Sequence, residues 1–362
     1  QEGFPSFAYR LEQGKHGKIW ITGPSGLISF DGYETQIYTH DPSDSTSIPE
    51  GSAYDVLNDN SGHLWIQGQN VSIYEFETEI FKEVHIPDSL PRYSFGNGMI
   101  KSSDSLIWVG ANDGVYRFSI PTSDKPTPEV SYFGIDELEG SSNWVNDLIE
   151  SPDGKLWISS NEGLFFLDPF TGSYTKAELS DQIPDGVDFS YSSFMILDQE
   201  NTVWISLDGG FLRYTEGENQ PEFLSTLGED NFSLEGIEAL SMNVTSDGSI
   251  WIGTVSSGAL QFHPSTNKLT QYKSNSGNGE SISENIVYEI LEDMDGNLWF
   301  GHLGNGMSMM YEKAWNYTFK KIAEADDPNA DSNNIYDFEP DAEGNIWAIT
   351  LNSLAFIPAD GG

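Results

Sequence analysis

Short apolar runs, separated by polar breaks, recur along the whole chain at a nearly constant interval. Each interval contains a turn, a small residue, and a tryptophan followed by an apolar neighbour. A repeat of this period indicates an array of supersecondary units, and it constrains the fold more strongly than any single segment does. The tryptophans are 43 to 49 residues apart, at Trp20, Trp65, Trp108, Trp157, Trp204, Trp251, Trp299 and Trp347.

Each unit contains four short runs, which predict four antiparallel strands, A to D. A tight A–B turn precedes the tryptophan: glycine lies three residues before it in six copies, and Asn201 and Ser105 take its place in the other two. Glycine and asparagine reach positive φ at little cost, as hairpin turns require. The third run often begins at glycine, and the fourth is more polar, as in 268–272 and 317–320.

One four-stranded meander cannot bury both of its faces. A radial arrangement lets each sheet pack on two neighbours, with the tryptophan as a wedge between them. The eight copies therefore predict an all-β chain folded as a single β-propeller of eight four-stranded blades, with seven blades as the alternative. A β-solenoid is the competing architecture, but its repeats are usually shorter.

The predicted propeller is one domain, residues 1–362, because no linker or shift in composition interrupts the repeat. The last blade has no fourth run after Ile357 and is expected to be incomplete. The predicted blades are 1–42, 43–88, 89–134, 135–180, 181–228, 229–275, 276–323 and 324–362.

The charge balance is strongly acidic, with 16 basic against 57 acidic residues and a net charge of −41. No basic face remains for nucleic acid or an anionic membrane. The acidity suits either a solvated surface in salty water, where ions screen self-repulsion, or a face that attracts cations. The chain has no cysteine, which excludes disulfides and thiol catalysis and fits an exported protein. No apolar run approaches the roughly 18 residues of a membrane span.

In a propeller of this kind the D–A and B–C connections share one face, here named the loop face. The A–B and C–D turns share the other, the turn face. The A–B turns are short and uniform, whereas the D–A loops are long and individual, and variable loops on a rigid frame usually carry binding. These loops are 39–51, 87–97, 134–143, 180–190, 228–236, 274–285 and 323–334.

Aromatic, amide and other polar side chains lie where these connections meet the inner strands. Aromatic planes beside amides and carboxylates suit a sugar, which offers apolar ring faces and hydroxyl edges. The alternative is that these side chains only fill space at the strand ends. The ligand-binding candidates are Tyr54, Tyr93, Asn143, Trp144, Tyr191, Asp208, Tyr288, His302 and Tyr336.

Charged residues also interrupt the apolar runs of the inner strands. Buried charges must be paired or hydrated, so these side chains are expected to line a central channel. These residues could form structural ion pairs, or they could surround a bound cation or a column of water. The channel-lining candidates are Arg10, Asp55, Asp147, Glu289 and Asp337.

No catalytic constellation stands out from the six scattered histidines, and no HExxH, Gly-x-Ser-x-Gly or EF-hand pattern occurs. We therefore assign no catalytic residue and expect that no cofactor is required. A calcium ion is the one metal considered, with candidates in two D–A loops, at Asp41 with Asp44 and at Asp326 with Asp327.

Several segments resemble the regulator-propeller repeat. They are GLISFDGY (26–33), YTHDP (38–42) and DNSGHLWI (59–66), and the opening QEGFPS (1–6) resembles the short lead into the first blade. That repeat builds the periplasmic sensor region of hybrid two-component systems in Bacteroidetes-type bacteria, and such propellers commonly detect oligosaccharides. Family sensors usually add a second propeller, a small β-sandwich, a membrane helix and a histidine kinase. None of these follows Gly362, so the chain is expected to be a fragment or a free-standing relative.

Three functions remain open at this point. The first is a periplasmic or extracellular sensor that binds a carbohydrate for a two-component system, and the missing catalytic cluster favours it. The second is a polysaccharide lyase, which would need a histidine or tyrosine base beside an arginine or metal. The third is a protein-interaction scaffold without a small ligand. The expected partners are an oligosaccharide or other small ligand, and further sensor domains or a dimer partner. We expect no nucleic acid partner and no membrane segment.

Overall fold

The computed structural model divides the chain into two compact units, Gln1–Glu312 and Lys313–Gly362. Within the described residues the sheets are antiparallel, three short 3-10 turns occur, and there is no α-helix. A helix long and apolar enough to cross a membrane is likewise absent from them. The structure describes residues 8–24, 26–91, 95–138, 144–179, 182–185, 187, 189, 193–215, 221–275, 281–304, 306–311, 335–340, 346–350 and 354–357.

The described part of the first unit forms seven blade sheets, six of them four-stranded meanders. The first three blades are β1 (Leu11–Gln13), β2 (Ile19–Gly23), β3 (Gly26–Phe30), β4 (Thr35–Tyr38); β5 (Asp55–Asn58), β6 (His63–Gln67), β7 (Val71–Glu75), β8 (Ile80–Glu83); and β9 (Phe95–Lys101), β10 (Leu106–Ala111), β11 (Gly114–Ser119), β12 (Val130–Gly134). The next three are β13 (Val145–Glu150), β14 (Leu156–Ser160), β15 (Gly163–Leu167), β16 (Tyr174–Lys176); β17 (Met195–Leu197), β18 (Thr202–Leu207), β19 (Gly210–Thr215), β20 (Glu222–Leu224); and β23 (Ala239–Val244), β24 (Ile250–Thr254), β25 (Ala259–His263), β26 (Lys268–Tyr272).

The seventh blade has three described strands, β27 (Val287–Glu292), β28 (Leu298–His302) and β29 (Met307–Met310). The fourth strand predicted for it, over 317–320, lies outside the described residues. A small hairpin, β21 (Thr226–Leu227) with β22 (Phe232–Ser233), lies in the loop between the fifth and sixth blades.

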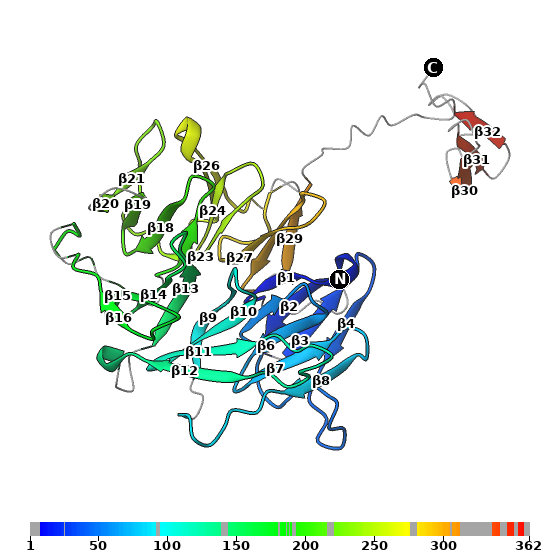
Figure 1. The fold of residues 1–362 in the computed structure, drawn as a ribbon. Helices are drawn as coiled ribbons and strands as arrows, with labels where there is room; N and C mark the ends of the chain where they lie inside the picture. The colour runs from blue at the N-terminus through cyan, green and yellow to red at the C-terminus, as the bar shows by residue number, and fades with distance from the viewer. Residues whose placement is uncertain are drawn as a thin grey trace. The chain divides into compact units, whose positions relative to one another are not determined.

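The ring closes after seven blades. The inner strands contact one another in chain order, β1, β5, β9, β13, β17, β23 and β27, and β27 contacts β1 again. Figure 1 shows β27 beside β1. At this seam the Ala8 N–H donates to the His302 carbonyl at 3.2 Å, and the Met294 N–H donates to Gln13 Oε1 at 2.6 Å. The prediction of eight blades is therefore wrong, and the alternative of seven is the observed number.

The tryptophan wedges explain why the seventh blade can close the ring. Trp20 packs on Tyr74 of the next blade, with ring centroids 5.1 Å apart, and five of the other wedges make a contact of this kind. Trp299 of the seventh blade meets Phe30 of the first blade at 6.0 Å and 73°. Further contacts of this kind are Trp65 with Phe118, Trp157 with Tyr214, Trp204 with Phe262 and Trp251 with Phe300. The last indole of the ring thus has its partner in the first blade.

The eighth repeat forms a sheet of its own in the second unit. Its strands are β30 (Ile335–Pro340), β31 (Ile346–Thr350) and β32 (Leu354–Ile357), paired antiparallel in that order. Trp347 lies opposite Glu339 and Phe356, in the register that the other tryptophans have in their blades. The eighth repeat therefore forms the antiparallel hairpin strands that the sequence predicts.

The A–B turns have the predicted conformation. Asn201 and Ser105 adopt φ of 60° and 62°, in the left-handed region that Gly154 and Gly248 occupy in other copies. The residue six positions before the tryptophan then accepts the indole N–H: Asp198 receives Trp204 at 2.8 Å. Further acceptors are Asp293 for Trp299, Asp59 for Trp65 and Ser102 for Trp108.

Replacing Asp198 with alanine is expected to lower the free energy of unfolding by about 2–3 kcal/mol, because buried N–H donors would lose their acceptor. The carboxylate accepts from the Trp204 indole at 2.8 Å and from the Glu200 and Thr202 amides at 2.9 Å. Urea denaturation followed by tryptophan fluorescence measures the loss. The control is Asp208→Ala, in an exposed B–C turn, where a change within about 0.5 kcal/mol is expected. Equal losses in both variants would contradict this role for Asp198.

Candidate functional site on the ring axis

The strand register places two residues of every inner strand on the ring axis. In each inner strand, the residue that pairs with the position after the tryptophan is buried within the blade. The residues directly before and after it on the strand point to the opposite side, toward the axis. The upper set, here named the charged tier, is Arg10, Asp55, Gly98, Asp147, Phe194, Ser241 and Glu289. The lower tier, opposite the tryptophans, is Glu12, Leu57, Ile100, Ile149, Ile196, Asn243 and Leu291. Both tiers line an axial cavity of about 410 Å³.

Arg10 is the cation of the charged tier and connects residues from across the ring. Its Nη1 lies 3.1 Å from Glu289 Oε2 in the seventh blade, and its Nε lies 3.9 Å from Asp55 Oδ1 in the second. Its guanidinium also lies over the ring of Phe194 in the fifth blade, 5.5 Å from the centroid. The structure thus brings together four of the predicted channel-lining residues, since Asp147 is the fourth charge of this tier.

Backbone donors of neighbouring residues hold the Asp147 carboxylate in place. It accepts from the Met195 N–H of the next blade at 2.7 Å and from the Leu148 N–H at 2.8 Å. Asp55 accepts from the Val56 N–H at 2.8 Å. The charged tier contains one arginine and three carboxylates, so its negative charge exceeds its positive charge.

The pKa values follow from that imbalance. Burial raises the pKa of Glu289 to about 7 and that of Asp147 to about 6, although Arg10 opposes both shifts. Burial also raises the pKa of Asp55. For Arg10, burial lowers the pKa, but the facing carboxylates of Glu289 and Asp55 raise it by more, so the guanidinium stays charged.

Glu12 is the one carboxylate of the lower tier, among mostly apolar neighbours. Its Oε1 accepts from the Asn58 N–H at 2.9 Å. Burial is the main reason that its pKa is raised to about 8, and the negative charges of Asp55 and Glu289 add to the shift. Glu12 was not predicted from the sequence, although its place two residues after Arg10 matches the alternation of a strand.

Three tyrosines cluster on the loop-face side of the charged tier, each directly before one of its residues, and we name them the tyrosine entrance. Tyr9 stacks on Tyr54, with centroids 6.3 Å apart and planes at 18°, and meets Tyr288 at 5.7 Å and 53°. All three are half-buried and come from the first, second and seventh blades. Burial, and then the neighbouring Tyr288 and Tyr54 hydroxyls, raise the pKa of Tyr9. Tyr54 and Tyr288 were predicted as ligand residues, whereas Tyr9 was missed.

A repeated dipeptide would have identified Tyr9. Each of these tyrosines precedes a charged residue of the charged tier: Tyr9 precedes Arg10, just as Tyr54 precedes Asp55. At Tyr288 the strand also carries a β-bulge, since its register with β28 shifts between Val287 and Glu289. Bulges re-aim side chains beside binding sites, which explains how a strand residue comes to face the entrance.

The other predicted residues do not join this cluster. His302 is fully buried, its Nδ1 is 3.1 Å from the Ile286 carbonyl and its Nε2 is 2.8 Å from Ser308 Oγ, so it supports the seventh blade. Burial lowers the pKa of His302. Asp208 is exposed in a B–C turn, and Trp144 lies just before β13. Tyr336 and Asp337 belong to β30 of the second unit. Tyr93, Asn143 and Tyr191 lie outside the described residues.

The described residues offer no group of three histidine, cysteine or acidic side chains that could hold a metal ion. In the first calcium candidate, Asp41 accepts from the Ser43 amide and hydroxyl at 2.8 and 2.7 Å, and Asp44 accepts from those of Thr46 at 2.9 and 2.6 Å. Both carboxylates therefore serve the loop itself. Asp326 and Asp327 lie outside the described residues.

Comparison with protein families identifies the repeats. The family model described as two component regulator propeller matches residues 139–162 and 281–304. These segments contain the A–B hairpins of the fourth and seventh blades. No curated protein matches the chain in sequence.

Solved structures share the fold at low sequence identity. The extracellular domain of the putative hybrid two component system BT4673 from B. thetaiotaomicron is 19% identical, with a TM-score of 0.65 over 99% of this chain and 44% of its own. The corresponding domain of BT3049 is also 19% identical, with a TM-score of 0.65 over 97% of this chain and 51% of its own. PorZ, a surface component of the type-IX secretion system of Porphyromonas gingivalis, is 16% identical, with a TM-score of 0.61 over 84% of this chain and 46% of its own. This chain thus spans about half the length of these three structures.

Proposed function

Because the chain carries two-component regulator propeller repeats, we propose that its first unit is a ligand-sensing module that works outside the cytoplasm. The extracellular domains of two hybrid two-component systems share its fold, which supports both the sensing role and a periplasmic or extracellular location. We propose an oligosaccharide as the ligand and the tyrosine entrance as its binding site.

The arrangement of Tyr9, Tyr54 and Tyr288 carries this proposal. Stacked and tilted phenol rings present apolar planes, and their hydroxyls add hydrogen-bonding groups at the edges. A sugar ring needs both, and its hydroxyls would also meet the charges of Arg10 and its partners one residue deeper. Because the three tyrosines come from three adjacent blades, a bound sugar would span the ring-closing seam between the seventh and first blades.

A lyase is a weaker interpretation of the same residues. A tyrosine that acts as a base benefits from a low pKa, whereas burial raises the pKa of Tyr9. A uronate substrate needs a free cation, whereas Arg10 is already engaged by Glu289 at 3.1 Å. Both features favour binding without turnover.

A glycan array followed by thermal-shift measurement tests the proposal. We expect at least one oligosaccharide to raise the melting temperature while remaining intact on chromatography after long incubation. The absence of any shift across a broad panel of neutral and acidic oligosaccharides would contradict carbohydrate sensing. Formation of unsaturated uronate products would instead support the lyase.

A further inference from the structure

We propose that the axial cavity binds a primary alkylamine, which enters from the turn face with its ammonium directed at the charged tier. The cavity holds about 410 Å³, which falls in the range of small-molecule sites. Its lining begins at the charged tier and continues along the inner strands toward the turn face, as far as Leu197 and Val244. The tyrosine entrance lies on the other side of the charged tier and contributes no lining residue. The amine site is therefore separate from the proposed carbohydrate site.

The side chains that line the axial cavity carry more negative than positive charge. Arg10 is the one basic lining residue, whereas the carboxylates of Glu12, Asp55, Asp147 and Glu289 all line the same space. Arg10 lies 3.1 Å from Glu289 and 3.9 Å from Asp55, and the charges of these two acids also act on Glu12. Buried charges are stable only when they are paired, so a bound ammonium would supply positive charge where the fold provides too little.

Ser241 adds an unpartnered hydroxyl to the same site. It belongs to the charged tier, lines the axial cavity and is only 3% exposed. Its Oγ has no hydrogen-bond partner among the described residues. Buried hydroxyls are nearly always hydrogen-bonded, so this one indicates a group that the chain itself does not supply. An N–H of a ligand held at the charged tier could donate to it.

The wall below the charged tier is mostly aliphatic. The lower tier lies two residues further along the strands, which places it roughly 6–7 Å from the charges. Its side chains would remove an alkyl chain of four to six carbons from water and so stabilise its binding. The aliphatic members of the lower tier are Leu57, Ile100, Ile149, Ile196 and Leu291.

The combination of a charged end and an aliphatic wall selects the ligand class. A metal ion needs several oxygen ligands, and the described residues offer no group of three acidic or histidine side chains that could hold one. A carboxylate or phosphate would be repelled by the four acids. A neutral sugar would leave the charges unbalanced and would place hydroxyls against aliphatic carbons. A primary alkylamine offers three N–H donors for the carboxylates and Ser241, and a chain for the lower tier.

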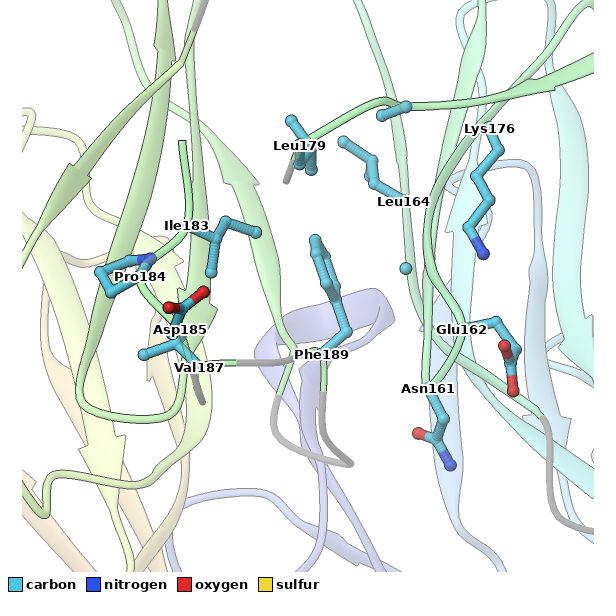
Figure 2. Close-up of a pocket in the computed structure, with 12 residues that line it drawn as sticks. Asn161, Glu162, Leu164, Lys176, Leu179, Ile183, Pro184, Asp185, Val187 and Phe189 are labelled. Atoms are coloured by element: carbon cyan, nitrogen blue, oxygen red, sulfur yellow. The ribbon is translucent and has the colours of Figure 1, made fainter. Parts of the chain in front are cut away.

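A pocket of similar size beside the fourth blade lacks this arrangement. Figure 2 shows it between β15, β16 and the loop that leads to the fifth blade, with a volume of about 390 Å³. Leu164 and Phe189 line it and belong to the core between the fourth and fifth blades. Its one cation, Lys176, lies 5.5 Å from the ring centroid of Phe165, which belongs to the core on the third-blade side. Charge and apolar floor thus lie on opposite faces of that sheet, whereas the axial cavity gathers both around one space.

Isothermal titration of the full chain with n-hexylamine at pH 8 tests the inference. We expect hexylamine to bind. Hexanol keeps the chain but lacks the charge, and methylamine keeps the charge but lacks the chain. Each should therefore bind at least tenfold more weakly than hexylamine. No heat from hexylamine at millimolar concentration would overturn the proposal, as would equal binding of hexylamine and either analogue.

Two glutamate variants show whether the amine binds at the axis. Glu12→Gln should weaken hexylamine about tenfold and leave hexanol unchanged, because only the amine uses that carboxylate. The matched control is Glu77→Gln, since Glu77 is exposed in the second blade, and it should bind hexylamine as the parent does. An equal effect of the two substitutions on hexylamine would overturn the assignment to the axial cavity.

The dependence of binding on pH gives a further readout of the same site. Burial raises the pKa of Glu12 to about 8 and that of Glu289 to about 7, with Asp55 and Asp147 nearby and Arg10 opposing the shift of Glu289. These acids must lose protons to pair with an ammonium, so hexylamine should bind the parent at least tenfold more tightly at pH 8 than at pH 6. An affinity that does not change between these two pH values would contradict binding at these carboxylates.

Discussion

Replacing Arg10 with methionine is expected to lower the free energy of unfolding at pH 8 by about 3–5 kcal/mol, the usual effect of removing one partner from a buried ion pair. Methionine keeps the apolar contact with Phe194 but leaves Asp55, Asp147 and Glu289 without their cation. The substitution also removes the 3.1 Å contact to Glu289 that connects the first blade to the seventh. Chemical denaturation of both proteins at pH 8 measures the loss.

The loss should shrink by about half or more at pH 5, because the unpaired buried carboxylates can be neutralised by protons instead. The pKa of Glu289, raised by burial to about 7, and that of Asp147, about 6, already lie above that pH. The control is Arg213→Met, which breaks a surface pair with Glu222 whose side chains are 39% and 54% exposed, and about 1 kcal/mol or less is expected. A loss for Arg10→Met that does not depend on pH, or that matches the control, would contradict the proposed charge balance.

The second large effect concerns the pH dependence of stability. Glu12, Glu289 and Asp147 have pKa values of about 8, 7 and 6 in the folded chain, raised mainly by burial above the ordinary 4.5 of glutamate and 3.8 of aspartate. Between those ordinary values and pH 8 the folded chain holds more protons than the unfolded chain. The stability from these groups is therefore complete at about pH 4 and is lost as the pH rises toward 8. Turn carboxylates such as Asp293 have lowered pKa values, because the Trp299 and Asn297 donors outweigh burial, and their contribution is lost only below about pH 4.

Glu12→Gln isolates the largest of these shifts. Glutamine stays neutral and its carbonyl oxygen can still accept from the Asn58 N–H, so the variant should match the parent at pH 5. At pH 8 it should be more stable than the parent by about 3–4 kcal/mol, since the parent carboxylate starts to ionise in a buried site there. Denaturation at pH 5, 6, 7 and 8 measures the difference, with the exposed Glu77→Gln as control. A constant difference between Glu12→Gln and the parent across this range would refute a titrating Glu12.

The blade structure could be predicted from the sequence because its signals are local. The A–B turn, the tryptophan and the following apolar pair specify a hairpin within one repeat, and left-handed φ at Asn201 and Ser105 confirms the turn chemistry. The number of blades is not a local property. It depends on whether Trp299 finds its aromatic partner in the first blade, and every repeat carries the same local signals whether it belongs to the ring or not.

The candidate site shows the same division between local and distant information. Charges at alternating positions of apolar strands indicated Arg10, Asp55, Asp147 and Glu289, and the register brings them to the axis. The place of His302 could not be predicted in the same way, since its partners, the Ile286 carbonyl and Ser308, depend on the pairing of strands.

Titration of an oligosaccharide selected on the glycan array against Tyr54→Ala and Tyr33→Ala tests the central claim most directly. Tyr54 stacks at the tyrosine entrance, whereas Tyr33 is 95% exposed in a C–D turn on the opposite face. We predict that Tyr54→Ala weakens binding about tenfold, as expected from the loss of one aromatic contact, and that Tyr33→Ala binds as the parent does. Unchanged affinity in Tyr54→Ala, or an equal loss in Tyr33→Ala, would contradict ligand recognition at the axis of the ring.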